Sequence, residues 1–179
     1  MVAHLERNEV DFALVSWLPS HLKLSSVDML ENRLLLIGSG SALVKKRNTA
    51  DLLESVPLIY REEGSATRSS MEAYIGAQQI AVKKKLVLTS NEAVKQAVIA
   101  GLGYSIMPVI GLKNELREGQ LQVIPAKGLP IVSRWHLVWL TEKNLSPAAR
   151  AYLDFIRAEK EQIVASAFGW LKDFSGHMD

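Results

Sequence analysis

The residues best suited to chemistry lie in a short loop, Gly64 to Arg68, which follows an apolar run. Ser65 and Thr67 carry hydroxyl groups, and Arg68 carries a planar fork of hydrogen-bond donors. If a helix begins here, its first backbone N–H groups are free as well. Such donors suit a carboxylate, a phosphate or a sulfate. The alternative is a capped helix whose arginine makes a surface salt bridge, and the residues alone leave both interpretations open.

Other chemical signatures are missing from the sequence. There is no cysteine, which excludes disulfides, thiolate catalysis and sulfur-ligated metals. The Gly-x-Gly segments at 38–40 and 101–103 lack the third glycine of a dinucleotide loop. The four histidines are far apart, with no pair at i,i+4 spacing, so no metal site is predicted. Glu62 and Glu63 fit a solvated turn better than an acid–base pair. We expect no catalytic residue, metal or cofactor.

Helix signals surround the loop. Ser65 stands where an N-cap belongs, with apolar residues following at helical spacing. Thr89 and Glu92 have the spacing of a capping box, and Gly101 has the place of a helix-ending glycine. Ser146 is followed by proline, which is typical of the first turn of a helix.

Strand signals alternate with these helices. Short apolar runs predict strands at 10–17, 33–38, 57–61, 85–89, 104–107, 121–124 and 135–140. The alternation predicts mainly parallel sheets with helices on their faces. The stretches 33–41 and 125–134 show no helix signal, which predicts a chain that crosses twice between two α/β lobes with a cleft between them.

Composition narrows the class of protein. Lysine and arginine number 21 and aspartate and glutamate 19, so the net charge of +2 gives no positive field for nucleic acid. Glu6, Glu9 and Asp11 interrupt the segment where a signal peptide needs an unbroken apolar stretch. No segment approaches the roughly 20 apolar residues of a membrane span. The sequence predicts a soluble, cytoplasmic protein with no membrane partner.

Several segments have a recognisable order and spacing, above all residues 97–108 (AVIAGLGYSIMP) and 145–153 (LSPAARAYL). They resemble the stretch A-V-x-A-G-L-G-I-[AG]-x-L-P and the helix S-P-A-A-R-A-F in the effector-binding domain of LysR-type transcription regulators. Residues 10–15 (VDFALV) resemble its D-[LIF]-A-[IL] strand. Residues 34–43 resemble its crossing strand, with Ser41 and Ala42 in place of His-Pro, and residues 57–68 its second-lobe opening.

The resemblance implies a type 2 periplasmic-binding-protein-like fold with two crossover strands. Lobe one would comprise residues 1–34 and 133–179, and lobe two residues 35–132. Family members have two further strand–helix units before the position of Asp11, so the first lobe is expected to be truncated, with an open sheet edge. The family's N-terminal winged helix-turn-helix is also expected to be missing from this sequence.

The resemblance also implies site residues. Ser16 matches the small polar residue that ends a strand of lobe one and contacts effector in the family. Ser65, Thr67 and Arg68 match the effector loop of lobe two, although Ala66 stands where some members have a hydroxyl. Asn91 lies at the start of a helix on the hinge side. Part of the family's site lies on the first missing strand–helix turn.

The leading hypothesis is a regulatory domain that senses a small anionic metabolite without reacting with it. DNA binding would then belong to a domain outside this chain, and the whole protein would form a homo-oligomer, a dimer or tetramer. The alternatives are a solute-binding receptor or a prephenate-dehydratase-like enzyme of the same fold, whose Thr-Arg-Phe motif is echoed only by Thr67 and Arg68.

Overall fold

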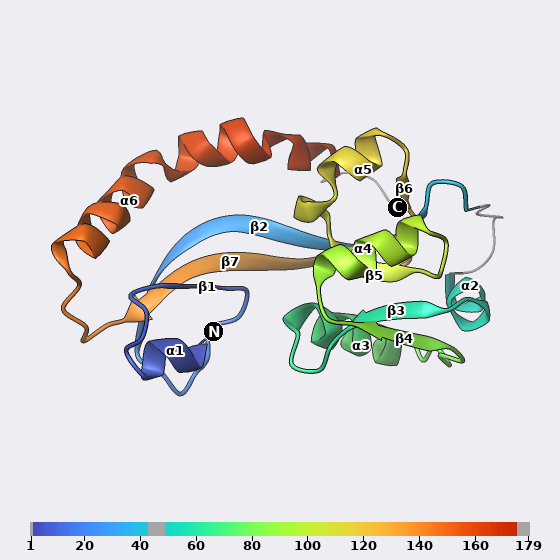
Figure 1. The fold of residues 1–179 in the computed structure, drawn as a ribbon, viewed down its shortest axis with the longest axis horizontal. Coiled ribbons are helices and arrows are strands. Elements are labelled where there is room, and N and C mark those ends of the chain that lie inside the picture. Colours follow the sequence, from blue (N-terminus) through green and yellow to red (C-terminus); the bar gives the residue numbers. More distant parts are fainter. Residues whose placement is uncertain (1, 43–48, 175–179) are drawn as a thin grey trace. The chain divides into compact units, whose positions relative to one another are not determined.

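The computed structural model describes residues 2–42 and 49–174 (Figure 1). The chain divides into two compact units: residues 1–32 with 133–176, here unit 1, and residues 33–132, here unit 2. Two long strands, β2 (Leu24–Ser39) and β7 (Ile131–Leu140), contribute residues to both units. The α/β class and the type 2 fold with two crossover strands are confirmed by the solved structures compared below.

Unit 1 is built on a small sheet in which β1 (Ala13–Val15) pairs antiparallel with β7. Leu137 and Trp139 of β7 pack with α6 (Pro147–Phe168), while Val138 packs with Leu5 of α1 (Val2–Glu6). Successive side chains of a strand point to opposite faces, so the two helices cover opposite faces of this sheet. Among the described strands β1 pairs only with β7, so its other side is an edge of this sheet, as expected from the sequence.

The long helix α6 begins as its sequence predicts. Ser146 Oγ accepts a hydrogen bond from Ala149 N at 3.1 Å, and Pro147 occupies the first turn, where its missing N–H costs nothing. A 3₁₀ turn, Gly169–Phe174, follows the helix. None of the described helices is long and apolar enough to cross a membrane.

Unit 2 contains the predicted alternation of strands and helices. Its elements are α2 (Thr49–Ser55), β3 (Leu58–Arg61), α3 (Ala66–Ala77), β4 (Lys85–Leu88), α4 (Asn91–Ile99), β5 (Ser105–Pro108), the 3₁₀ turn Val109–Gly111, α5 (Lys113–Arg117) and β6 (Leu121–Val123). The core is apolar and comes from both strands and helices, including Leu36, Leu58, Met71, Ile75, Ile106 and Ile124.

Fewer of the described strand pairs are parallel than the sequence predicted. β3 and β4 are parallel, and a single parallel bridge joins Leu58 to Tyr104. By contrast, β5 and β6 pair antiparallel with β2, as β1 does with β7. The expectation of mainly parallel sheets is therefore wrong for these described pairs. The reason is that β2 and β7 are long crossover strands, which contribute to the sheets without a preceding strand–helix unit of their own.

Two glycines that follow α4 allow the chain to end this helix and to approach β3 closely. Gly101 has φ +76°, the left-handed conformation predicted for a helix-ending glycine, and Leu102 N donates back to Ala97 O at 3.0 Å. Gly103 lies against β3 so closely that a Cβ atom would sit 2.4 Å from Pro57 O. α4 is therefore fixed closely against β3 at its C-terminal end.

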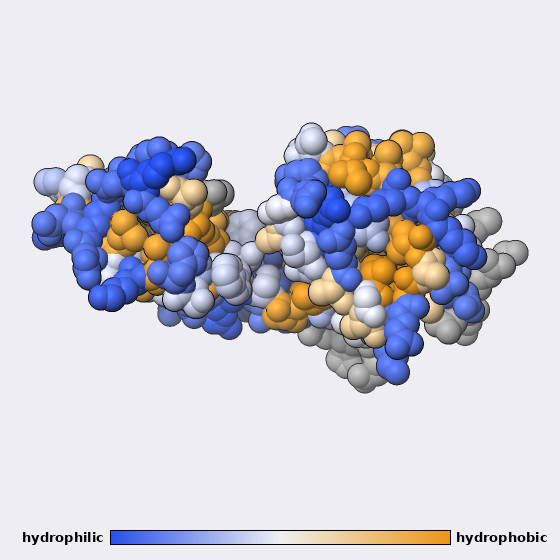
Figure 2. Space-filling view, turned by 90° about the horizontal axis from the view of Figure 1, so that it is seen from below, coloured by the Kyte–Doolittle hydropathy of each residue, from blue (hydrophilic) through white to orange (hydrophobic). Residues whose placement is uncertain are grey.

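Large apolar side chains remain exposed on both units. Figure 2 shows apolar areas interrupted by hydrophilic residues on the visible face. Those of unit 1 are Val10, Leu14, Trp17, Leu18, Tyr152 and Phe155, and those of unit 2 are Leu86, Val87, Leu102 and Val132.

Candidate functional site

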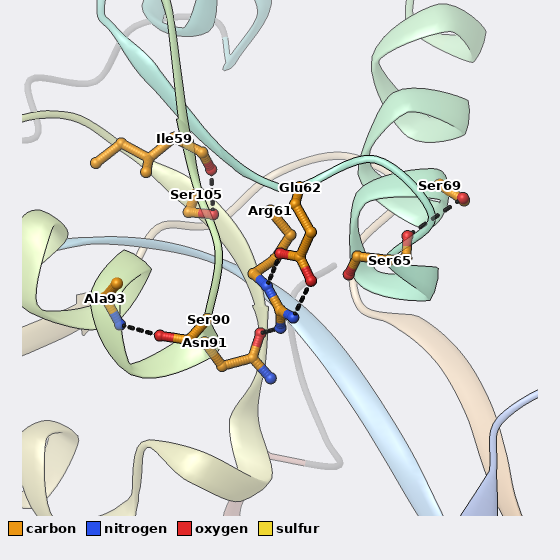
Figure 3. A network of polar contacts seen from close by, with 9 residues as sticks. All are labelled: Ile59, Arg61, Glu62, Ser65, Ser69, Ser90, Asn91, Ala93 and Ser105. Carbon is orange, nitrogen blue, oxygen red and sulfur yellow. Dashed lines mark hydrogen bonds and ion pairs between the residues drawn. The ribbon is translucent and has the colours of Figure 1, made fainter. Parts of the chain in front are cut away.

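The candidate site lies at the carboxyl edge of the parallel pair in unit 2. Arg61 is the last residue of β3 and is in register with Leu88, the last residue of β4. Each strand is followed by a helix, α3 or α4, whose N-terminus begins near this edge (Figure 3). Ligands of α/β folds bind outside the carboxyl ends of parallel strands, where helix N-termini also gather.

Arg61 is the cation of this edge. Its Nε and one terminal nitrogen donate to the two carboxylate oxygens of Glu62, both at 2.7 Å, and its other terminal nitrogen donates to Asn91 Oδ1 (Figure 3). The Arg61 side chain is only 18% exposed, against 37% for Glu62. Hydrogen bonds from Arg61, assisted by one from the backbone of Glu62 itself, lower the pKa of the Glu62 carboxyl from 4.5 to about 2.

The start of α3 has donors without a partner in the helix. Ser65 occupies the N-cap position with extended backbone angles, but its hydroxyl makes no cap hydrogen bond in the described structure. The first intrahelical bond runs from Ser69 N to Ser65 O at 3.0 Å. The N–H groups of Ala66, Thr67 and Arg68 precede it and so have no acceptor within the helix. Figure 3 shows the Ser65 hydroxyl on the side of α3 that faces Arg61 and Glu62.

The start of α4 is satisfied by its own residues. Ser90 Oγ accepts a hydrogen bond from Ala93 N at 3.0 Å. The predicted capping box of Thr89 and Glu92 is therefore wrong: the cap is Ser90, and the residue three positions later is Ala93, which has no side-chain acceptor to complete a box. The Glu92 carboxylate accepts from Lys95 and Gln96 instead, which lowers its pKa. Thr89 and Ser90 are both good caps, and only the helix phase set by packing distinguishes them.

Arg68 points along α3 rather than toward Arg61. Its Nε donates to Glu72 Oε1 at 2.8 Å, and Lys85 Nζ donates to the same oxygen at 3.1 Å. Arg68, and to a lesser degree Lys85, lowers the pKa of the Glu72 carboxyl. The salt bridge considered as an alternative in the sequence is thus present in this structure.

The remaining sequence-predicted site residues have separate places. Thr67 lies in the first turn of α3 and is half-buried. Asn91 is the first residue of α4 and touches Arg61, so Asn91 and the Ser65 loop meet at one edge of unit 2. Ser16 directly follows β1 in unit 1 and is half-buried.

Sequence reasoning did not identify Arg61 and Glu62 as parts of this site. Glu62 was assigned with Glu63 to a solvated turn, whereas its carboxylate is ion-paired with Arg61. The available signal was the position of Arg61: a charged residue that ends an apolar strand at the carboxyl edge of a parallel pair.

A hollow lies on unit 1 and is lined by Asn8, Lys23, Leu140, Glu142, Lys143 and Asn144. Its cations already have partners, because Lys143 pairs with Asp11 at 2.8 Å and Lys23 pairs with Glu142 at 3.5 Å. No three histidine, aspartate or glutamate side chains form a metal-binding group among residues 2–42 and 49–174, and His177 lies outside these ranges. Arg61 has partners as well, but the start of α3 beside it offers a hydroxyl and N–H groups with no acceptor in the helix, so this edge is the better candidate.

Two crossover strands and a polar site at the carboxyl edge of a parallel pair define a ligand-binding domain of the type 2 periplasmic-binding-protein-like class. The sequence model of the LysR substrate binding domain matches residues 1–161. The chain belongs to this family, which confirms the resemblance found in its motifs.

Individual relatives agree with this assignment. The chain is 34% identical over 165 residues to the HTH-type transcriptional activator CmpR of Synechocystis sp., covering 91% of this chain and 54% of CmpR. It is 32% identical to a RuBisCO operon transcriptional regulator of Allochromatium vinosum, covering 89% of this chain and 53% of that protein. The chain thus spans about half the length of these relatives.

A solved structure is similar in fold and sequence. The regulatory domain of CcmR from Synechocystis PCC6803, in complex with 2-PG, superposes with a TM-score of 0.80 and 28% identity, covering 89% of this chain and 78% of that chain. The regulatory domain of HypT from Salmonella typhimurium superposes with a TM-score of 0.77 at 18% identity, which supports the fold alone.

Proposed function

We propose that this chain is the part of a LysR-type transcription regulator that senses a small anionic metabolite, and that it does not transform what it binds. The carrying observation is the start of α3, where the Ser65 hydroxyl and three backbone N–H groups have no partner in the helix beside the guanidinium of Arg61. Unpaired donors beside a cation suit an anion, and none of these groups is a nucleophile activated by a neighbouring base.

The proposed contacts follow from the same edge. Ser65 and Thr67 would donate to the anion from α3, and Asn91 would hold Arg61 in place. Arg68 would contribute only when its pair with Glu72 opens. Ser16 of unit 1 is proposed as a further contact and is tested separately by substitution.

The relatives indicate which small acid to test first as the effector. CcmR forms a complex with 2-PG, and other relatives regulate RuBisCO operons. We therefore propose 2-PG, or an acid of similar size and charge, as the first effector to test. The relatives are transcription regulators, so the receptor and prephenate-dehydratase-like alternatives gain no support from them.

The wider protein is proposed to act in the cytoplasm as a homo-oligomer that binds DNA through a domain outside this chain. DarR of Vibrio fischeri, a regulator of similar fold, has been solved in complex with DNA. Effector binding would act by favouring one arrangement of the predicted lobes, residues 1–34 with 133–179 and residues 35–132, through its differential affinity for the two arrangements.

Calorimetric titration of the chain with 2-PG tests the proposal. We expect a dissociation constant of about 1 mM or tighter, equivalent to about −4 kcal/mol. Ser65→Ala should weaken binding severalfold. Ser166→Ala, an exposed serine of α6 whose hydroxyl donates to Ile163 O at 3.2 Å, is the matched control and should leave binding unchanged. No binding of 2-PG would contradict the proposed effector, and equal losses in both variants would contradict the site.

A further inference from the structure

We infer that Glu62 competes with the anionic effector: its carboxylate is bound to the bidentate face of the Arg61 guanidinium and must leave before an effector acid can form a bidentate pair there. The inference rests on the proposed function and adds a regulatory contact to the same site. It assigns Arg61 as the residue that selects an acidic ligand and Glu62 as the residue that sets its affinity.

Glu62 occupies the bidentate donor face of Arg61. Two of its nitrogens donate to Glu62 in the parallel, bidentate arrangement of a strong arginine–carboxylate pair, and the third donates to Asn91. These bonds use three of the five N–H groups of the guanidinium, so an anion can form a bidentate pair on the Nε side only by replacing Glu62. Since Arg61 is 18% exposed, a replacement that left its donors unpaired would be costly, whereas exchange of one acid for another keeps them paired.

Glu62 is the partner suited to exchange. It lies in the loop after β3 and is 37% exposed, while Asn91 is fixed in the first turn of α4, whose cap is complete. Its carboxyl has a pKa lowered to about 2 by Arg61, so the competing group is charged throughout the physiological range. The competitor therefore responds to ligand concentration and not to pH near neutrality.

Competition with the adjacent Glu62 determines which ligands can bind at Arg61. A carboxylate tethered one residue away acts at a high effective concentration, in the millimolar range or above. A simple anion that only replaces Glu62 gains little. A ligand with a second acidic or polar group can also use the unpaired Ser65 hydroxyl and N–H groups of α3, so the site favours small acids with two separate acceptor groups.

A purely structural ion pair makes a different prediction. If Arg61 and Glu62 only stabilise the β3–α3 turn, neutralising Glu62 lowers stability and leaves ligand affinity unchanged or weaker. If Glu62 competes, the same substitution raises affinity. Affinity, with stability recorded alongside it, therefore separates the two roles.

The test compares Glu62→Gln with Glu63→Gln, which makes the same change of charge at the exposed neighbouring position. Titrations with 2-PG and with inorganic phosphate are followed by calorimetry, and thermal unfolding checks each fold. We expect Glu62→Gln to bind 2-PG about tenfold more tightly, because tenfold corresponds to one charge-assisted hydrogen bond of about 1.4 kcal/mol. Glu63→Gln should stay within about twofold of the unsubstituted chain, as expected of an exposed charge.

Arg61→Lys provides the second arm, since it keeps the charge and removes the planar fork. On that background Glu62→Gln should no longer raise affinity, because the two substitutions act on one contact. If the unsubstituted chain binds 2-PG and Glu62→Gln binds no more tightly than Glu63→Gln, the competitor role is wrong and the proposed function stands. If neither the unsubstituted chain nor any variant binds, the proposed effector fails as well.

Discussion

The starts of α3 and α4 are built from the same parts and use them differently. Each helix follows a strand of the same parallel pair and has a serine with extended backbone angles at its N-cap. Ser90 uses its hydroxyl to cap α4, and Lys95 ties that helix to Glu115 at 2.6 Å. The Ser65 hydroxyl leaves α3 uncapped, beside an arginine whose fork is filled by Glu62.

Residue type alone therefore does not decide the role of a helix N-cap serine. At α4 the serine hydroxyl caps the helix, so its loss should lower the free energy of unfolding. At α3 the serine hydroxyl is available to a ligand, so its loss should lower ligand affinity.

The closest packing on the α4 side is at Gly103. A Cβ there would lie 2.4 Å from Pro57 O and 3.2 Å from Ile59 Cγ1, so Gly103→Ala must displace β3 or the chain after α4. We expect the free energy of unfolding to fall by about 2 to 3 kcal/mol, the upper range for overpacking a core. Urea unfolding measures this free energy, and a loss below about 0.5 kcal/mol would show that the chain at this end of α4 can shift at little cost.

The ion pair on the α3 side predicts a specific acid response. The pKa of Glu62 is lower in the folded chain than its usual 4.5, so its contribution to stability is complete above about 4.5 and is lost as the pH falls toward about 2. The unsubstituted chain should therefore unfold at a higher temperature than Glu62→Gln above pH 4.5, and the gap should close below it. Thermal unfolding from about pH 7 to about pH 2.5 measures this, and a gap that stays constant would show that Arg61 does not hold the Glu62 carboxylate.

The two serines give the most direct contrast. Ser90→Ala should lower the free energy of unfolding by about 1 kcal/mol, the usual cost of a lost cap, and Ser65→Ala should change it by less than about 0.5 kcal/mol. In binding the order should reverse. Equal stability losses would mean that Ser65 caps α3 in solution, and the availability of its hydroxyl would no longer support a ligand site.

The smallest effect is expected within α3. Gly76 lies inside the helix, and a Cβ added there would have no atom within 4 Å. Gly76→Ala should therefore stabilise the chain by about 0.5 kcal/mol, because alanine reduces the conformational freedom of the unfolded state. Ligand affinity should stay unchanged. If Gly76→Ala changed the affinity, a stiffer α3 alone would alter binding, and a change of affinity in Ser65→Ala could not be assigned to the lost hydroxyl.

Much of this arrangement was predictable from local chemistry. The loop from Gly64 to Arg68, the helix end at Gly101 and the cap at Ser146 each rest on residues within a few positions of one another. The start of β2 was not predictable: it begins at Leu24, nine residues before the apolar run, because its first half is only partly buried and shows no apolar run.

The site was predicted in part. Hydroxyls, N–H groups and a nearby arginine pointed to an anion, but the arginine that faces this edge is Arg61. Arg68 is held along α3 by Glu72, four residues further on, which is a pairing that helical spacing indicates. Arg61 is held by Asn91, thirty residues further on, and this pairing follows from tertiary packing that spacing along the chain does not encode.

The most direct test of this site maps 2-PG onto the chain by its backbone amide resonances. We predict that saturating 2-PG shifts the amide signals of Thr67 and Arg68 at the start of α3 most strongly, with Asn91 next, while Ala93, whose amide is held by the Ser90 cap, moves little. If the largest shifts instead fall around Lys143 in the hollow of unit 1, or if no amide of the α3 start responds, the assignment of this edge as the effector site is contradicted.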